Sequence, residues 1–348
     1  MSEKQNRQSN YDLLRIFATI AVIIIHANFH FFGDRFETPD LSPEFITENL
    51  LNIITRFSVP VFIMLSGGFN LNNPGNGDAV SFYKKTTWKI VLPTVIIAFI
   101  FMVIDVTKAI ILGTSVVGAL ANYIHFPYAL WYMVILVMLY FITPLLVKMK
   151  STISEKHYVI LSVILMVYAV CSQALSTYRV SYTLGTVAAF LGYYLMGDVI
   201  MNHLRLKIPM VISLIIMAAS IALTWFIRYK GFTFYTSVTY RNFFSPTIVL
   251  FSMCMLIFFK NINMKADLSY PSRLTFYIYL FHSITLNLVY FLIERFVTAP
   301  VNELILIAGA TISTLILSLI PAAAADHIWR RQTKLKEKWY GAKFWKAI

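Results

Sequence analysis

Long apolar runs follow one another along nearly the whole chain, and they limit what it can fold into. Of the 348 residues, 58% are apolar and 13% are charged, whereas soluble domains carry about 25% charged residues. A run of about 20 apolar residues can cross a bilayer as a helix. We therefore expect an all-α membrane protein, a bundle of about ten transmembrane helices in residues 1–325, followed by a basic cytoplasmic tail, 326–348. The expected spans are 12–33, 47–71, 88–112, 127–147, 157–175, 183–201, 208–228, 243–260, 274–294 and 301–325.

Basic residues are unevenly distributed between the two sides of this expected bundle. Most of the 29 Lys and Arg residues fall on the side that carries the N-terminus. Because Lys and Arg concentrate in cytoplasmic loops, we expect this side to be cytoplasmic. An even number of crossings then puts both termini in the cytoplasm. The net charge of +13 follows from this topology and from contact with membrane lipid, so no nucleic-acid partner is expected.

Arg15 and His26 lie eleven residues apart in the first apolar run. On a helix this spacing is about 20° past three full turns and about 16 Å of rise, so both side chains point the same way. Arg15 would lie at one membrane surface, with Asp12 as its salt-bridge partner. His26 would lie near the bilayer midplane, where ionisable groups are costly and are usually functional.

Two roles are open for His26 on this pattern. A histidine titrates near neutral pH and can take a hydroxyl proton as a general base. It can equally be a helix-packing histidine bonded to a neighbouring carbonyl. His26 and His30 also have the i, i+4 spacing of some metal ligands, but no third ligand is evident, and no metal is expected.

His282 and Arg56 are expected at a depth similar to that of His26, on two other helices. Three such side chains at one depth indicate a shared polar cavity. Asn28 follows His26 closely but points elsewhere on the helix, so it would contribute only weakly to the polar lining. Arg56 can stabilise a developing oxyanion, or it can pair with a carboxylate such as Glu48. His282 can orient a ligand, or it can be a satisfied histidine of the bundle.

A basic rim is expected where the first helices meet the cytoplasm. Arg15, Lys84, Lys85 and Lys89 contribute to it. Four cations at one surface can hold the phosphates of a nucleotide-type donor. The lysines can also anchor the chain to anionic lipid.

Two short motifs complete the candidate binding residues. Ser66-Gly67-Gly68 permits a close approach of the backbone, either to another helix or to a ligand. Trp131 and Tyr132 are expected near the outer end of their helix, as anchors in the aromatic belt at the membrane surface. A sugar face can also stack on such rings.

Six stretches of the sequence resemble, in order, patterns of the acyltransferase-3 family of bacterial integral-membrane acyltransferases. Each is weak alone, but together they extend from residue 11 to about residue 290. They are Arg15 with His26, Arg56 to Gly67, Phe82-Tyr83-Lys84-Lys85 with Pro93, Leu130-Trp131-Tyr132 with Tyr140 and Thr143-Pro144, Tyr194-Leu195-Met196-Gly197, and Ile278-Tyr279-Leu280-Phe281-His282.

The resemblance implies an O-acyltransferase of the bacterial plasma membrane. Such a protein takes an acyl group, usually acetyl, from cytoplasmic acyl-CoA and delivers it to a hydroxyl of a cell-surface polysaccharide or lipid-linked sugar. Acyl-CoA is a co-substrate, and no permanently bound cofactor is implied. His26 would be the catalytic histidine and Arg15 a donor-side arginine. Family members often carry arginine where Lys84 and Lys85 stand, and lysine binds phosphate as a point charge.

The residue patterns and the resemblance together give one set of expected roles, with residues 1–325 as the acyltransferase-3-like domain. We expect catalysis by His26, as base or acyl acceptor, and by Arg56. The residues expected to bind the donor are Arg15, Lys84, Lys85, Ser66 and Gly67. The residues expected to bind the acceptor are His282, Trp131, Tyr132 and Asn28.

A transporter of a sugar, lipid or small anion is the alternative function. Helices with charges at the midplane also suit a carrier. Inverted repeats would favour transport, and none is found in this sequence. The sequence also contains no P-loop, Rossmann glycine signature or nucleophile elbow, so it gives no support for ATP-driven transport.

Overall fold

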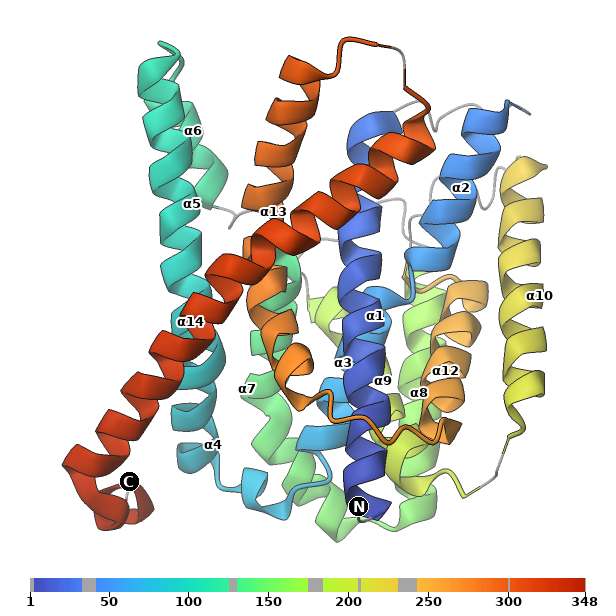
Figure 1. Ribbon diagram of the computed structural model, residues 1–348. Coiled ribbons are helices and arrows are strands. Elements are labelled where there is room, and N and C mark those ends of the chain that lie inside the picture. The colour runs from blue at the N-terminus through green and yellow to red at the C-terminus, as the bar shows by residue number, and fades with distance from the viewer. Residues whose placement is uncertain are drawn as a thin grey trace.

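The computed structural model describes residues 3–32, 42–124, 130–174, 184–205, 208–230, 243–299 and 301–347. Every element of regular secondary structure among them is helical, as expected (Figure 1). The elements are α1 Glu3–Phe32, α2 Pro43–Thr55, α3 Ser58–Asn70, η1 Pro74–Gly77, α4 Ala79–Thr86, the π-helix η2 Thr87–Val91, α5 Leu92–Ile111, α6 Val116–Ile124, α7 Trp131–Thr152, α8 Glu155–Ala174, α9 Leu184–Asp198, the π-helix η4 Val199–His203, α10 Met210–Tyr229, α12 Pro246–Asn261, α13 Ser269–Phe296 and α14 Glu303–Ala347.

Seven helical segments in the described ranges, two of them made of consecutive helices, are long and apolar enough to cross a membrane. They are Ser9–Phe32, Pro43–Asn70, Ala79–Ile111, Trp131–Thr152, Met210–Tyr229, Ser269–Phe296 and Glu303–Gln332. This is the architecture of a multi-pass membrane protein. Each expected span contains a helix, although the expected limits at residues 33, 127, 175 and 183 lie outside the described residues. The count of ten crossings and the cytoplasmic termini stay predictions. Helix α14 runs unbroken past residue 325, and the division of the chain there also stays a prediction.

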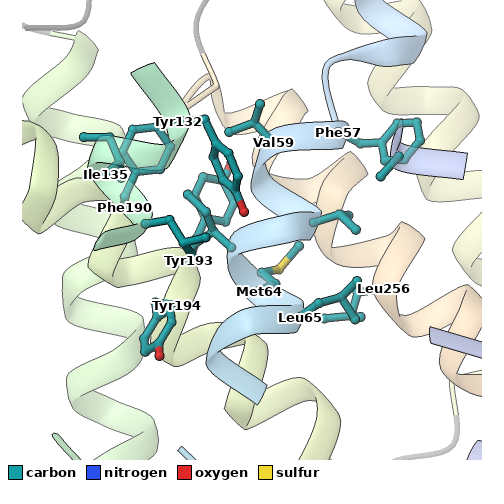
Figure 2. Packing of buried hydrophobic residues seen from close by; sticks show 14 of the residues in the cluster. Phe57, Val59, Met64, Leu65, Tyr132, Ile135, Phe190, Tyr193, Tyr194 and Leu256 are labelled. Carbon is teal, nitrogen blue, oxygen red and sulfur yellow. The ribbon is translucent and has the colours of Figure 1, made fainter. Parts of the chain in front are cut away.

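Helix α3 forms the centre of the bundle. Nine of its 13 residues are buried, and it packs against α1, α7, α9 and α12. Figure 2 shows Met64 and Leu65 projecting from α3 among the neighbouring helices, and Tyr132 of α7 lying against it. Because α3 contacts the first helix and three later ones, its side chains are placed to join distant parts of the chain at one site.

Two glycines bring the backbones of α3 and α9 into contact. A methyl group on Gly67 of α3 would lie 1.8 Å from the carbonyl oxygen of Tyr194. A methyl group on Gly197 of α9 would lie 2.0 Å from the carbonyl oxygen of Met64. Small residues at helix contacts allow such close approach in membrane bundles. The contact fixes the central helix against α9 at the level of Ser66.

The expected span 47–71 consists of two helices rather than one. Ser42 caps α2, accepting a hydrogen bond from the Phe45 N–H at 3.2 Å, and Pro43 stands at a first-turn position where its missing N–H is harmless. Pro60 has no N–H to donate to the Arg56 carbonyl, so the helix is interrupted at Arg56-Phe57. The break puts Arg56 at the end of α2, inside the bundle.

A buried carboxylate joins three helices at the end of the bundle where α1 begins, which we call the N-terminal face. Asp198 of α9 is fully buried and accepts hydrogen bonds from Lys150 Nζ at 2.6 Å, Tyr158 Oη at 2.8 Å and Asn202 Nδ2 at 2.8 Å. A buried charge needs this kind of complete pairing. The network ties α7, α8 and α9 together at this face.

Candidate active site

His26 of α1 and His282 of α13 lie side by side. Their ring centroids are 5.1 Å apart, and the ring planes are tilted by 44°. His26 is half-buried, while His282 is 1% exposed. The two imidazoles expected at a common depth are thus brought together by the packing of α13 on α1.

One nitrogen of His282 is fixed by the backbone and the other is left available. Nδ1 lies 2.5 Å from the carbonyl oxygen of Tyr279. A carbonyl can only accept, so in a neutral ring Nδ1 carries the proton and Nε2 keeps its lone pair. Nε2 is buried and has no hydrogen-bond partner among the described residues. It can therefore accept a proton donor, such as an N–H of His26 or a substrate hydroxyl.

Arg56 is held near His26 by two neighbours. Its Nε donates to Asn52 Oδ1 at 2.8 Å, and its guanidinium lies 5.4 Å from the centre of the Phe243 ring. The side chain is 9% exposed and interacts electrostatically with His26. A fixed cation in a water-poor site is suited to stabilise negative charge that develops beside it.

A line of side chains, which we call the connecting path, leads from this site toward the N-terminal face. It consists of Tyr279, Tyr132, Ser66 and Phe69. The rings of Tyr279 and His282 are 5.3 Å apart, and those of Tyr279 and Tyr132 are also 5.3 Å apart. The hydroxyl of Tyr132 lies near Ser66, which is on α3 three residues before Phe69.

Arg15 stands at the other end of the connecting path. Its guanidinium lies 4.7 Å from the centre of the Phe69 ring and interacts electrostatically with Tyr132. Its NH1 atom is 3.1 Å from Asp12 Oδ1, which confirms the expected salt bridge, and Ser272 also donates to that carboxylate at 2.6 Å. Neighbouring side chains therefore lead from Arg15 to His26, with the step from Ser66 to Phe69 made along helix α3.

One known protein family matches nearly the whole chain. The profile of the acyltransferase-3 family, described as an acyltransferase domain, matches residues 8–323. The chain belongs to this family. No curated protein and no solved structure matches it with significance. Family membership and the apolar helices together identify a membrane acyltransferase.

The glycines of the Ser66-Gly67-Gly68 motif allow a close approach to other helices, which is one of the two roles left open by the sequence. Gly67 approaches the backbone of α9 rather than an open surface, and the sulfur of Met201 would lie 2.2 Å from a methyl group on Gly68. Ser66 points instead to Tyr132. The acyltransferase thus uses both glycines for helix packing, while contact of Ser66 and Gly67 with the donor stays a prediction.

The aromatic pair lies at the start of α7, the helix end where it was expected. Tyr132 is 6% exposed and packs within the core, so its predicted role as an anchor in the aromatic belt is wrong. Spacing along α7 gives the depth of a residue but not the neighbours that cover it. Trp131 is half-buried and its ring stacks on Phe243 at 5.6 Å. Both rings lie beside residues of the site, and their binding of the acceptor stays a prediction.

The remaining expected residues lie on several elements. Lys84 and Lys85 are exposed on α4, which packs against α7, whereas Arg15 packs against Phe69 of α3. Asn28 is fully buried. His30 is stacked on Tyr290, with ring centroids 3.4 Å apart. The donor role of the lysines and the acceptor role of Asn28 stay predictions.

Three residues of the site were missed by sequence reasoning. Tyr279 precedes His282 by three residues and Asn52 precedes Arg56 by four, so helical spacing alone would have placed each on the same face as its partner. Phe243, which lies under Arg56, comes from the segment before α12. No local pattern in the sequence connects it to Arg56.

Proposed function

We propose that this acyltransferase moves an acyl group from cytoplasmic acyl-CoA to a hydroxyl of a cell-surface polysaccharide or lipid-linked sugar. Acetyl is the group proposed, since it is the usual one in the family. The bacterial plasma membrane is the proposed location, with the N-terminal face in the cytoplasm. The observation that carries the proposal is the connecting path from Arg15 to the paired imidazoles of His26 and His282.

In this proposal the donor lies along the connecting path. Its phosphates pair with Arg15, because arginine binds phosphate through several charged hydrogen bonds. The long arm of the donor extends for about 16 Å, the rise between Arg15 and His26 on the helix. The thioester then reaches His26, while the tyrosines of the path exclude water around the arm.

The reaction itself needs one proton acceptor and one site for negative charge. His26 takes the proton of the acceptor hydroxyl as the hydroxyl oxygen bonds to the thioester carbon. The carbonyl oxygen becomes an oxyanion beside Arg56. The carbon–sulfur bond then breaks, and the imidazolium returns its proton to the leaving sulfur. In an alternative order, the His26 nitrogen attacks the thioester first and passes the acyl group to the hydroxyl afterwards.

Mass spectrometry of surface glycans and lipid-linked sugars tests this function. We expect an acyl mass increment on one of these molecules in cells that make the protein and its absence in cells that lack it. The increment identifies the acyl group as well as the acceptor. If the two cell types differ in the amount of a transported molecule but in no covalent modification, the protein is a transporter and the proposal is wrong.

Arg15→Ala is expected to weaken binding of the donor. Charge-assisted hydrogen bonds contribute about 1.5–3 kcal/mol, so the KM for acyl-CoA should rise roughly tenfold to a hundredfold. Arg205→Ala is the matched control, since Arg205 is an exposed arginine of the same face, paired with Glu155, and should leave this KM unchanged. An unchanged KM in Arg15→Ala would show that Arg15 does not hold the phosphates.

A further inference from the structure

A second group of buried polar side chains lies on the side of His26 away from Arg15. We call it the amide cluster, and it consists of Asn28 of α1 with Glu48, Asn49 and Asn52 of α2. All four are at most 3% exposed. Helix α2 carries Glu48, Asn49 and Asn52 on one face and packs on α1 and α10. An ionisable residue buried in a membrane bundle, such as Glu48, indicates a functional site.

Hydrogen bonds fix the donor groups of two of these amides. Asn28 Nδ2 donates to the Glu48 carbonyl at 3.2 Å, and Asn49 Nδ2 donates to the Phe45 carbonyl at 2.8 Å. Because carbonyl oxygens only accept, the two side-chain nitrogens must be the atoms that face them. The other terminal atom of each amide, Oδ1, is therefore an oxygen.

Those two amide oxygens have no partner of their own. Oδ1 of Asn28 and Oδ1 of Asn49 are both buried and without a hydrogen bond among the described residues. Buried acceptors of this kind are normally satisfied. A ligand that satisfies them must present hydrogen-bond donors. Sugar hydroxyls do so, whereas a phosphate or carboxylate anion has none to offer.

The position of the cluster links it to the reaction centre. Asn28 follows His26 by two residues, so it lies about 3 Å farther from the N-terminal face but about 200° around the same helix, on the side that faces α2. Asn52 holds Arg56, and Asn49 lies about 10 Å from Arg56 along α2 in the direction of its N-terminus. The cluster thus extends from the site toward the face opposite Arg15.

We infer that the amide cluster binds the hydroxyl-bearing sugar of the acceptor, with the Oδ1 atoms of Asn28 and Asn49 accepting hydrogen bonds from its hydroxyls. This inference rests on the proposed function. It gives the acceptor an approach separate from the connecting path, so that donor and acceptor meet at His26 from opposite sides. Asn49 is a binding residue that the sequence did not indicate.

Asn49→Leu in the full-length protein tests the inference. Asn49 donates only to a carbonyl of its own helix, and leucine has the same number of side-chain heavy atoms as asparagine while removing a buried oxygen that has no partner among the described residues, so little stability should be lost. We expect the thermal midpoint in detergent to be unchanged or higher and the affinity for radiolabelled acetyl-CoA to stay within twofold. Acylation of the cell's own glycans, measured by mass spectrometry, should fall at least tenfold.

Two further variants make the result decisive. Asn49→Ala, measured in parallel, removes the amide without the bulk of leucine, and it should give the same loss of acylation. Thr311→Val is the matched control, because Thr311 of α14 also has a buried side-chain oxygen without a partner among the described residues, and it should acylate glycans normally.

The remaining outcomes separate the inference from the function on which it rests. Wild-type levels of glycan acylation in both Asn49 variants would overturn the inference. A joint loss of thermal stability, acetyl-CoA affinity and acylation in both would also overturn it, because the residue would then be structural. If the wild-type protein acylates no glycan or lipid-linked sugar, the proposed function itself fails.

Discussion

His26→Ala is expected to abolish measurable acyl transfer while leaving a folded protein in the membrane. A positioned general base contributes about 10²–10⁴-fold to a rate, and the His26 ring lies beside that of His282 on the helix face that also carries Arg15. The half-buried position of His26 allows its removal without opening a sealed cavity. The measurement is the acyl content of surface glycans in cells that contain equal amounts of wild-type and variant protein.

His30→Ala is the control for this result. His30 lies one helical turn beyond His26, and it stacks on Tyr290, which donates a hydrogen bond to the backbone carbonyl of His26 and not to its imidazole. It should therefore retain wild-type transfer. If His26→Ala retains transfer too, its imidazole is a packing group, and the alternative left open by the sequence is the right one.

Gly197→Ala and Gly67→Ala are expected to destabilise the protein strongly. Each added methyl group would meet a backbone carbonyl at 2.0 Å or less. A carbonyl within a helix cannot relieve the clash by changing rotamer, as a flexible side chain can. Helices α3 and α9 must therefore move apart. The free energy of unfolding should fall by an amount at the upper end of the range of about 1–3 kcal/mol that is typical of overpacked cores. The thermal midpoint and the monodisperse fraction in detergent, measured by size exclusion, report the loss.

Gly309→Ala provides a matched comparison within a helix. A methyl group on Gly309 of α14 has no atom within 4 Å, and alanine favours a helix over glycine by about 0.5–1 kcal/mol. This variant should be as stable as the wild type or slightly more stable. Equal midpoints for Gly197→Ala and Gly309→Ala would show that the close contact of α3 with α9 is not formed.

The helical fold follows from the sequence because apolar runs of membrane length leave the backbone no other way to satisfy its hydrogen bonds. The interruption of the second run was missed, although Pro60 gives its physical cause. A run read by average hydropathy appears continuous across a proline. The sequence alone therefore did not place Arg56 at a helix end.

The site was predictable where it depends on position along a helix. The similar depths of His26 and His282 follow from the helical rise. Their rings are neighbours in the structure, as similar depths require. The neighbours of Tyr132 were not predictable, because they come from α3 and α13. The same holds for Phe243 under Arg56. Contacts between distant segments depend on packing, which no spacing rule supplies.

Sealed membrane vesicles with the cytoplasmic face outward test the central claim most directly. Radiolabelled acyl-CoA, with acetyl and longer acyl groups in parallel, is supplied outside only, and label on glycans or lipid-linked sugars inside the vesicles is counted. The account predicts enclosed labelled product with the wild-type protein and at least about a hundredfold less with His26→Ala. Equal enclosed label with both proteins, or labelled product confined to the outer face, would contradict it.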